Sequence, residues 1–68
     1  QEFFLVSKER LNVKTEEGFE IYFSLKKSLA EQTTGLLTLF QNAFPPEKRE
    51  SVEYIDLRFD RIFVYPSQ

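Results

Sequence analysis

The 68-residue sequence contains no cysteine, histidine, methionine or tryptophan, and it has only two glycines. Without cysteine the chain forms no disulfide and offers no thiolate to a metal. Without histidine it lacks the commonest zinc ligand and the usual acid-base group near neutral pH. Two glycines are too few for a phosphate-binding loop, and no serine has a histidine partner. We therefore expect no metal, no cofactor and no catalysis, and an interaction domain is favoured over an enzyme.

Charge of one sign and long apolar runs are also lacking. Nine basic and eleven acidic residues are mixed along the chain and give a net charge of −2. Nucleic-acid binders usually gather a basic excess on one face, so this balance disfavours nucleic acid without excluding it. No apolar run approaches the roughly 18 residues of a membrane span, and no signal peptide is visible. Because the chain starts abruptly with a strand-like run at 3–6, we expect it to be a piece cut from a larger protein.

Aromatic residues are plentiful, with eight phenylalanines and three tyrosines, and they alternate with polar residues in the first half of the chain. The apolar run 3–6 is β-prone, and residues 11–15 alternate apolar with polar. Gly18 follows in a turn, where it can adopt the positive φ of a short hairpin. Residues 19–25 give the clearest alternation, with Phe19 on the apolar side. This half of the sequence predicts three antiparallel strands.

A helix is predicted to begin after Ser28, because Glu31 follows at the spacing of a capping box. Pro45 and Pro46 end it. Gly35 inside the helix either permits close approach to the sheet or is a tolerated defect, and the sequence does not choose between these. The predicted apolar stripe of the helix comprises Leu29, Thr33, Leu36, Leu37, Phe40, Ala43 and Phe44.

Two further strands are predicted, at 52–59 and at 62–65. In the first, Ile55, Leu57 and Phe59 alternate with polar residues and are expected in the core. The order is then β-β-β-α-β-β. We expect one α+β domain over residues 1–68, with an antiparallel sheet of about five strands covered on one face by one helix.

The carboxylates and the aromatic residues suggest two other functions, acid-base catalysis and nucleic-acid binding, and the sequence supports each only weakly. Asp56 and Asp60 lie on one face, but nothing indicates a buried carboxyl or a cleft. We instead interpret Asp56 and Arg58 as side chains on one face of the strand that bond across strands or to solvent. Tyr22 and Tyr54 fall opposite the core face, where bases could stack, but no basic surround accompanies them.

The last strand is more informative, because its four residues, 62–65, are apolar without alternation. Natural edge strands are normally guarded by charge, and here only Arg61 and Pro66 flank the run. Either the strand is internal and covered on both faces, or its open edge accepts a partner strand by β-augmentation.

The segment 54–65, with the sequence YIDLRFDRIFVY, resembles the C-terminal signature of the bacterial cell-division family FtsQ, called DivIB in Gram-positive bacteria. That family carries an (I/V)-D-L-R-(Y/F) strand, a short turn and a final apolar strand. The hairpin at 11–23 and the helix with spaced leucines after Ser28 agree with the family in kind. Many members have a longer turn, with glycine, where this chain has Asp60 and Arg61.

The resemblance implies a non-enzymatic scaffold of the divisome on the extracytoplasmic face of the bacterial cytoplasmic membrane, at the division septum. The chain would be most of the family's β domain, without the POTRA domain and the transmembrane anchor. Its partners would be FtsB (DivIC) and FtsL, which add a strand to the C-terminal edge. Carried over by position, the partner-binding residues would be Arg58, Phe59, Asp60, Arg61, Ile62, Phe63, Val64 and Tyr65. A POTRA-like or other extracytoplasmic interaction module of a secretion or transport system is the alternative.

Overall fold

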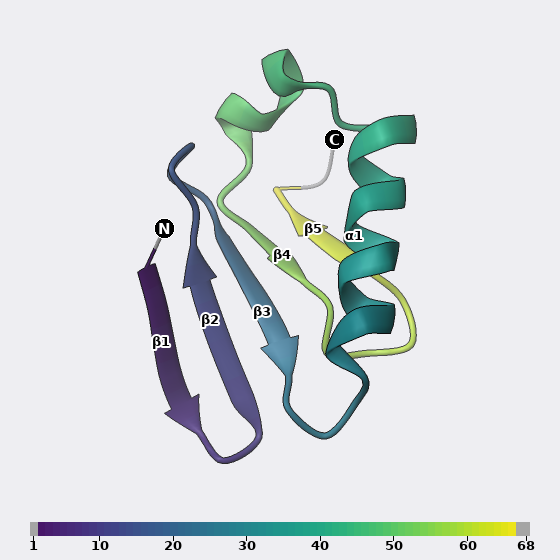
Figure 1. The fold of residues 1–68 in the computed structure, drawn as a ribbon. Coiled ribbons are helices and arrows are strands. Elements are labelled where there is room, and N and C mark those ends of the chain that lie inside the picture. The colour runs from purple at the N-terminus through teal and green to yellow at the C-terminus, as the bar shows by residue number, and fades with distance from the viewer. Residues whose placement is uncertain (1, 67–68) are drawn as a thin grey trace.

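The computed structural model describes residues 2–66, so positions 1, 67 and 68 of the predicted domain lie outside the described residues. Five strands form one sheet in the order β1-β2-β3-β4-β5, and one helix follows β3 (Figure 1). The predicted α+β class and the element order β-β-β-α-β-β are confirmed. The elements are β1 (Glu2–Ser7), β2 (Arg10–Lys14), β3 (Glu20–Ser24), α1 (Leu29–Asn42), the 3-10 helix η1 (Pro46–Ser51), β4 (Tyr54–Asp56) and β5 (Phe63–Tyr65).

The first three strands form the predicted antiparallel meander. Gly18 adopts φ +103° in the turn between β2 and β3, a conformation that favours glycine. The Gly18 N–H donates to the carbonyl of Thr15 at 3.0 Å and so closes the turn. In β1 the register with β2 shifts between Leu5 and Ser7, which is a β-bulge.

The helix α1 begins where the capping spacing predicts. The Ser28 hydroxyl accepts a hydrogen bond from the Glu31 N–H at 3.1 Å, which satisfies one free donor of the first turn. The helix ends at Asn42, shortly before Pro45. Within the described residues, no helix has the length and apolar character needed to cross a membrane.

The prediction of a wholly antiparallel sheet is wrong at one pair, because β3 and β4 run parallel. The chain leaves one end of β3, α1 carries it back to the other end, and β4 then runs in the same direction as β3. A helical crossover of this kind is the usual connection between parallel strands. The sheet is therefore mixed, with its parallel pair between β3 and β4.

The two C-terminal strands are shorter than predicted. The predicted strand 52–59 shrinks to β4, because the Asp56 carboxylate accepts the Arg58 N–H at 3.0 Å and turns the chain. Phe59, expected in the core, is consequently exposed. The last strand begins at Phe63 rather than at residue 62.

The core lies between α1 and the sheet. From the predicted helical stripe, Leu36 and Phe44 are buried, whereas Leu29 and Leu37 are exposed. Leu37 lies about 100° around the helix from Leu36, which turns it away from the inward face. The buried apolar residues are Val13, Phe19, Ile21, Leu36, Phe44, Val52, Ile55 and Leu57.

Candidate partner-binding edge

Among the described strands, β5 is the last strand of the sheet, so it is an edge strand and not an internal one. It pairs with β4 alone among the described strands. Phe63 and Tyr65 are both 52% exposed, whereas Val64 between them packs against the core. The strand thus offers two large apolar side chains and a backbone edge to another molecule.

The open backbone groups of β5 belong to Val64. The Tyr65 carbonyl accepts a hydrogen bond from the Glu53 N–H at 2.8 Å, so the backbone of Tyr65 faces β4. Successive residues of a strand direct their backbone groups to opposite sides. The N–H and C=O of Val64 therefore point away from β4, toward the position of an added strand.

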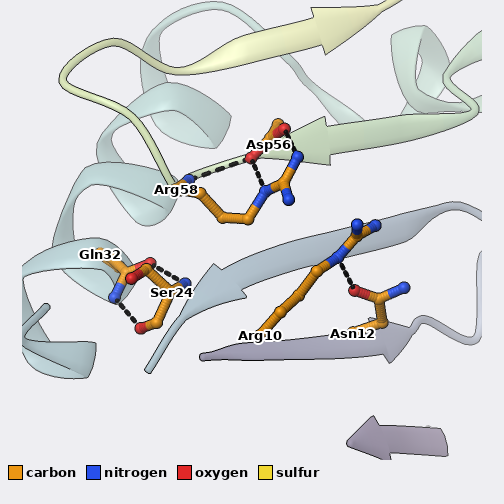
Figure 2. A network of polar contacts seen from close by, with 6 residues as sticks. All are labelled: Arg10, Asn12, Ser24, Gln32, Asp56 and Arg58. Atoms are coloured by element: carbon orange, nitrogen blue, oxygen red, sulfur yellow. Dashed lines mark hydrogen bonds and ion pairs between the residues drawn. The ribbon is translucent and has the colours of Figure 1, made fainter. Parts of the chain in front are cut away.

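An ion pair fixes the chain where β4 ends and the connection to β5 begins (Figure 2). Arg58 donates from Nε to Oδ1 of Asp56 at 2.9 Å and from Nη2 to Oδ2 at 2.7 Å. The Asp56 side chain is only 8% exposed, although nothing in the sequence indicated a buried carboxylate. A two-point contact of this kind sets the orientation of both groups. It anchors the first residue of the predicted binding segment.

The contact between Asp56 and Arg58 also shifts the pKa of both side chains. Burial disfavours the charged form of Asp56, but the hydrogen bonds and the charge of Arg58 outweigh burial and lower the pKa of Asp56 below its usual value. The hydrogen bond to Asp56 raises the pKa of Arg58. Both side chains therefore stay charged near neutral pH, as an ion pair and not as an acid and a base.

A shallow hollow of about 500 Å³ opens beside the start of β5. Phe59 and Phe63 meet edge to face there, with ring centroids 5.9 Å apart. Asp60 and Lys27 approach to 3.6 Å, but the Asp60 side chain is exposed, so this contact holds the loop weakly. The hollow combines aromatic surface with positive charge and is lined by Lys27, Arg58, Phe59, Asp60, Arg61 and Phe63.

The predicted site residues do not form one cluster. Those from Arg58 to Arg61 gather with Phe63 around the hollow. Val64 turns inward, and Ile62 lies against α1 near Gly35. Tyr65 lies on the sheet face opposite α1, where it belongs to a row of tyrosines.

That row crosses three strands and supports Tyr65. Tyr22 stacks on Tyr54 at 4.9 Å, and Tyr54 stacks on Tyr65 at 5.3 Å between ring centroids. Arg10 covers the other side of Tyr22 at 4.3 Å and is held by its Nε donating to Oδ1 of Asn12 at 2.9 Å (Figure 2). Burial and then the charge of Glu20 raise the pKa of Tyr22.

The tyrosine row is a feature that sequence reasoning missed. The rings occupy one another's faces, so Tyr22 and Tyr54 do not present open faces to bases. Part of the row was predictable from the sequence, because Tyr22 and Tyr54 are both predicted on the outer face of the sheet. Tyr65 joins the row only because β4 pairs with β5, and the alternation of apolar and polar residues does not predict which strands pair.

Within residues 2–66, no three acidic side chains gather in a way that would hold a metal ion. Comparison with known proteins gives no match: no family model, no curated protein and no solved structure matches this chain.

Proposed function

We propose that the chain is a protein-binding scaffold domain of the FtsQ/DivIB kind, whose β5 edge accepts a strand from a partner division protein. The partners proposed are FtsB (DivIC in Gram-positive bacteria) and FtsL, on the extracytoplasmic face of the cytoplasmic membrane at the septum. The observation that carries the proposal is the exposed apolar edge strand β5, with Phe63 and Tyr65 half exposed and the backbone of Val64 facing outward.

Strand addition fits this edge because it uses both backbone and side chains. Main-chain hydrogen bonds to the Val64 N–H and C=O would supply affinity, and the side chains on alternate positions would supply specificity. The aromatic and cationic hollow beside β5 would receive a side chain of the partner, and Arg61, which belongs to no ion pair among the described residues, favours an acidic one.

Scaffolding requires neither an acid nor a nucleophile. The ion pair of Asp56 with Arg58 has a structural task under this proposal, which is to hold the loop that leads into β5. The proposal thus accounts for the signature residues without assigning them to catalysis.

The test is an NMR titration of the isotope-labelled chain with a peptide from the extracytoplasmic segment of the FtsB or DivIC partner. We expect the amide signals of Phe63, Val64 and Tyr65 to shift or broaden. Val64→Pro removes an outward N–H without removing a hydrogen bond to β4, and proline is tolerated at edge positions of this type. We expect at least tenfold weaker binding for Val64→Pro and for Phe63→Asp.

The matched control is Leu5→Asp, which places the same charge on the opposite edge of the sheet. It should bind the peptide as the wild type does. Melting curves of each variant show whether the fold is retained. Unchanged binding by folded Val64→Pro and Phe63→Asp would overturn the proposed mechanism.

A further inference from the structure

Among the described strands, β1 lies at the other edge of the sheet, at the side away from β5 (Figure 1). All six of its residues are exposed, and most of them are apolar. Phe3 is 66% exposed and Leu5 is 71% exposed, more than any side chain of β5. An edge this long and apolar is normally blocked or paired. The proposed function uses β5 and leaves this strand unexplained.

The backbone of β1 has a defined set of open groups. The Thr15 N–H, one residue beyond β2, donates to the Phe19 carbonyl of the β3 side at 2.9 Å. Because backbone direction alternates along a strand, the odd-numbered residues of β2 face β3 and the even-numbered ones face β1.

The register of β1 with β2 then assigns the outward groups. Phe4 pairs with Asn12, an even-numbered residue, so the backbone of Phe4 faces β2. The N–H and C=O groups of Phe3 and Leu5 point outward. These four groups lie before the bulge at Val6, in the regular part of the strand.

The side chains of β1 divide between the two faces. Phe3 lies on the face that carries α1 and lines an apolar groove of about 360 Å³ between the first strands and the helix. Leu5 pairs with Leu11, which also lines this groove, and so lies on the same face. Phe4 lies on the opposite face. Both faces of the edge are therefore apolar.

We propose that β1 pairs antiparallel with β1 of a second copy of this chain, across a two-fold axis at Phe4. Phe3 of each copy then faces Leu5 of the other, and their outward groups form four hydrogen bonds. On the opposite face the two Phe4 side chains meet. A ten-stranded sheet results, with the grooves of both copies adjoining at the axis.

Charge selects this arrangement over parallel pairing. Glu2 lies at one end of the strand and Lys8 directly after the other, and neither belongs to an ion pair among the described residues. In the antiparallel arrangement the Glu2 end of each strand lies beside the Lys8 end of the second copy, so opposite charges approach each other. Parallel pairing would place like charges side by side.

The buried surface indicates a weak, concentration-dependent dimer. Three large apolar side chains per copy, each about half to two-thirds exposed, bury roughly 800 Å² in total, which is below the roughly 1,200 Å² of stable interfaces and in the range of weak, transient ones. The dimer would leave β5 free on both copies. A dimeric scaffold would then present two partner-binding edges at opposite ends of one sheet.

Sedimentation equilibrium of the 68-residue chain tests the stoichiometry. We expect a monomer-dimer equilibrium, and Phe4→Lys should weaken it at least tenfold because the two lysines would face each other. Phe4→Glu should weaken it equally. An equimolar mixture of the two variants should associate again, because Lys then faces Glu across the axis. A chain that stays monomeric at millimolar concentration, or a mixture that does not recover, overturns the proposal.

Crosslinking tests the register, and the absence of native cysteine makes it specific. Directly opposite residues at a position without mutual hydrogen bonds have Cα atoms about 4.5 Å apart, within disulfide range. Phe4→Cys should therefore oxidise to a covalent dimer rapidly, and Tyr65→Cys on the other edge should not. The reverse result would assign the dimer to β5 and overturn the proposal.

The partner peptide separates this inference from the proposed function. An excess of peptide should leave the wild-type dimer intact, because the two occupants use different edges. Dissociation of the dimer by the peptide would overturn the β1 assignment. Failure of the peptide to bind would instead contradict the proposed function and would leave the sedimentation and crosslinking results to stand on their own.

Discussion

At the scale of single residues, Asp56 shows how a charged side chain is kept inside a small domain. Its carboxylate is 8% exposed and receives three hydrogen bonds from Arg58, one from the backbone and two from the guanidinium. Buried charges persist only when they are paired and hydrogen-bonded in this way. The Asp56 and Arg58 side chains therefore stabilise the turn after β4.

Asp56→Asn should destabilise the domain by about 1–2 kcal/mol at pH 7, because the charged hydrogen bonds are lost. The pKa of Asp56 is lowered in the folded state. As the pH falls, the unfolded chain takes up the proton first. The contribution of the carboxylate is thus complete above its ordinary pKa of about 4 and disappears as the pH drops through the folded value.

Urea unfolding between pH 7 and pH 2.5 measures this effect. The gap in unfolding free energy between wild type and Asp56→Asn should be constant from pH 7 to pH 5 and should narrow below about pH 4. Asp60→Asn is the control, since Asp60 is exposed, and it should leave stability almost unchanged. A gap that widens toward acid pH would contradict the assigned ion pair.

Gln32 is another polar residue that the fold buries, and its side chain links α1 to the end of β3 (Figure 2). Its Oε1 accepts the Ser24 N–H at 2.8 Å, and its Nε2 donates to the Ser24 carbonyl at 2.9 Å. Gln32→Ala leaves two buried backbone groups without partners, so it should cost about 2 kcal/mol. Thermal unfolding compares it with Gln41→Ala on the exposed face, which should change little. If Gln32→Ala and Gln41→Ala lower the stability equally, the contact between Gln32 and Ser24 does not contribute to the stability of the fold.

At the scale of elements, local signals predicted the starts and stops, and the long-range signals were missing. Ser28 and Pro45 mark the helix correctly because capping and proline geometry act within a few residues. The parallel pairing of β3 with β4 was not predictable, because the alternation around Ile55 is the same for either strand direction. The predicted apolar stripe likewise left out Gln32, whose amide is buried because it finds hydrogen-bond partners in Ser24 of β3 and in Ser28.

The candidate edge was predictable to a similar extent. The unguarded apolar run at 62–65 was compatible with an internal strand or an open edge, and among the described strands β5 is an edge strand. Which side chains face outward was not predictable, because Phe59 left the core only through the turn that Asp56 and Arg58 make. The exposure of β1 was missed too, since an apolar strand at 3–6 predicts burial as readily as an open edge.

Gly35 supplies a prediction for the helix. A Cβ at this position would meet only Cδ1 of Ile62 at 3.4 Å, the far end of a flexible side chain in a loop. Glycine in a helix interior costs up to about 1 kcal/mol relative to alanine. Gly35→Ala should therefore stabilise the domain by roughly 0.5–1 kcal/mol in thermal unfolding. Destabilisation instead would mean that α1 requires glycine to approach the 58–62 loop closely.

At the scale of the whole molecule, the parallel pair joins two halves. The β1-β2-β3 meander and the β4-β5 hairpin meet only between β3 and β4, with α1 packed over the junction. Ile55 lies at this junction, between Ile21 and Val64 of the neighbouring strands, and is 1% exposed. Both free edges lie at the outer limits of these halves. Both edge strands are therefore held in one sheet only while the packing between β3 and β4 is intact.

Ile55→Ala should cost about 2–5 kcal/mol, because a cavity opens where the two halves pack. A domain of this size has a total stability of roughly 3–10 kcal/mol, so much of this variant should be unfolded. Ile55→Val removes one methylene and should cost about 1 kcal/mol. Ile62→Ala, in the partly exposed loop, is the matched control and should cost less than Ile55→Ala.

Urea unfolding followed by two probes decides whether the junction unites the molecule. Far-ultraviolet circular dichroism reports α1, and tyrosine fluorescence reports the row of Tyr22, Tyr54 and Tyr65, since the chain has no tryptophan. Coincident transitions in the wild type and in Ile55→Val would show a single cooperative unit. If Ile55→Ala loses the tyrosine signal while α1 remains, the tyrosine row unfolds independently of α1, and the domain is not a single cooperative unit.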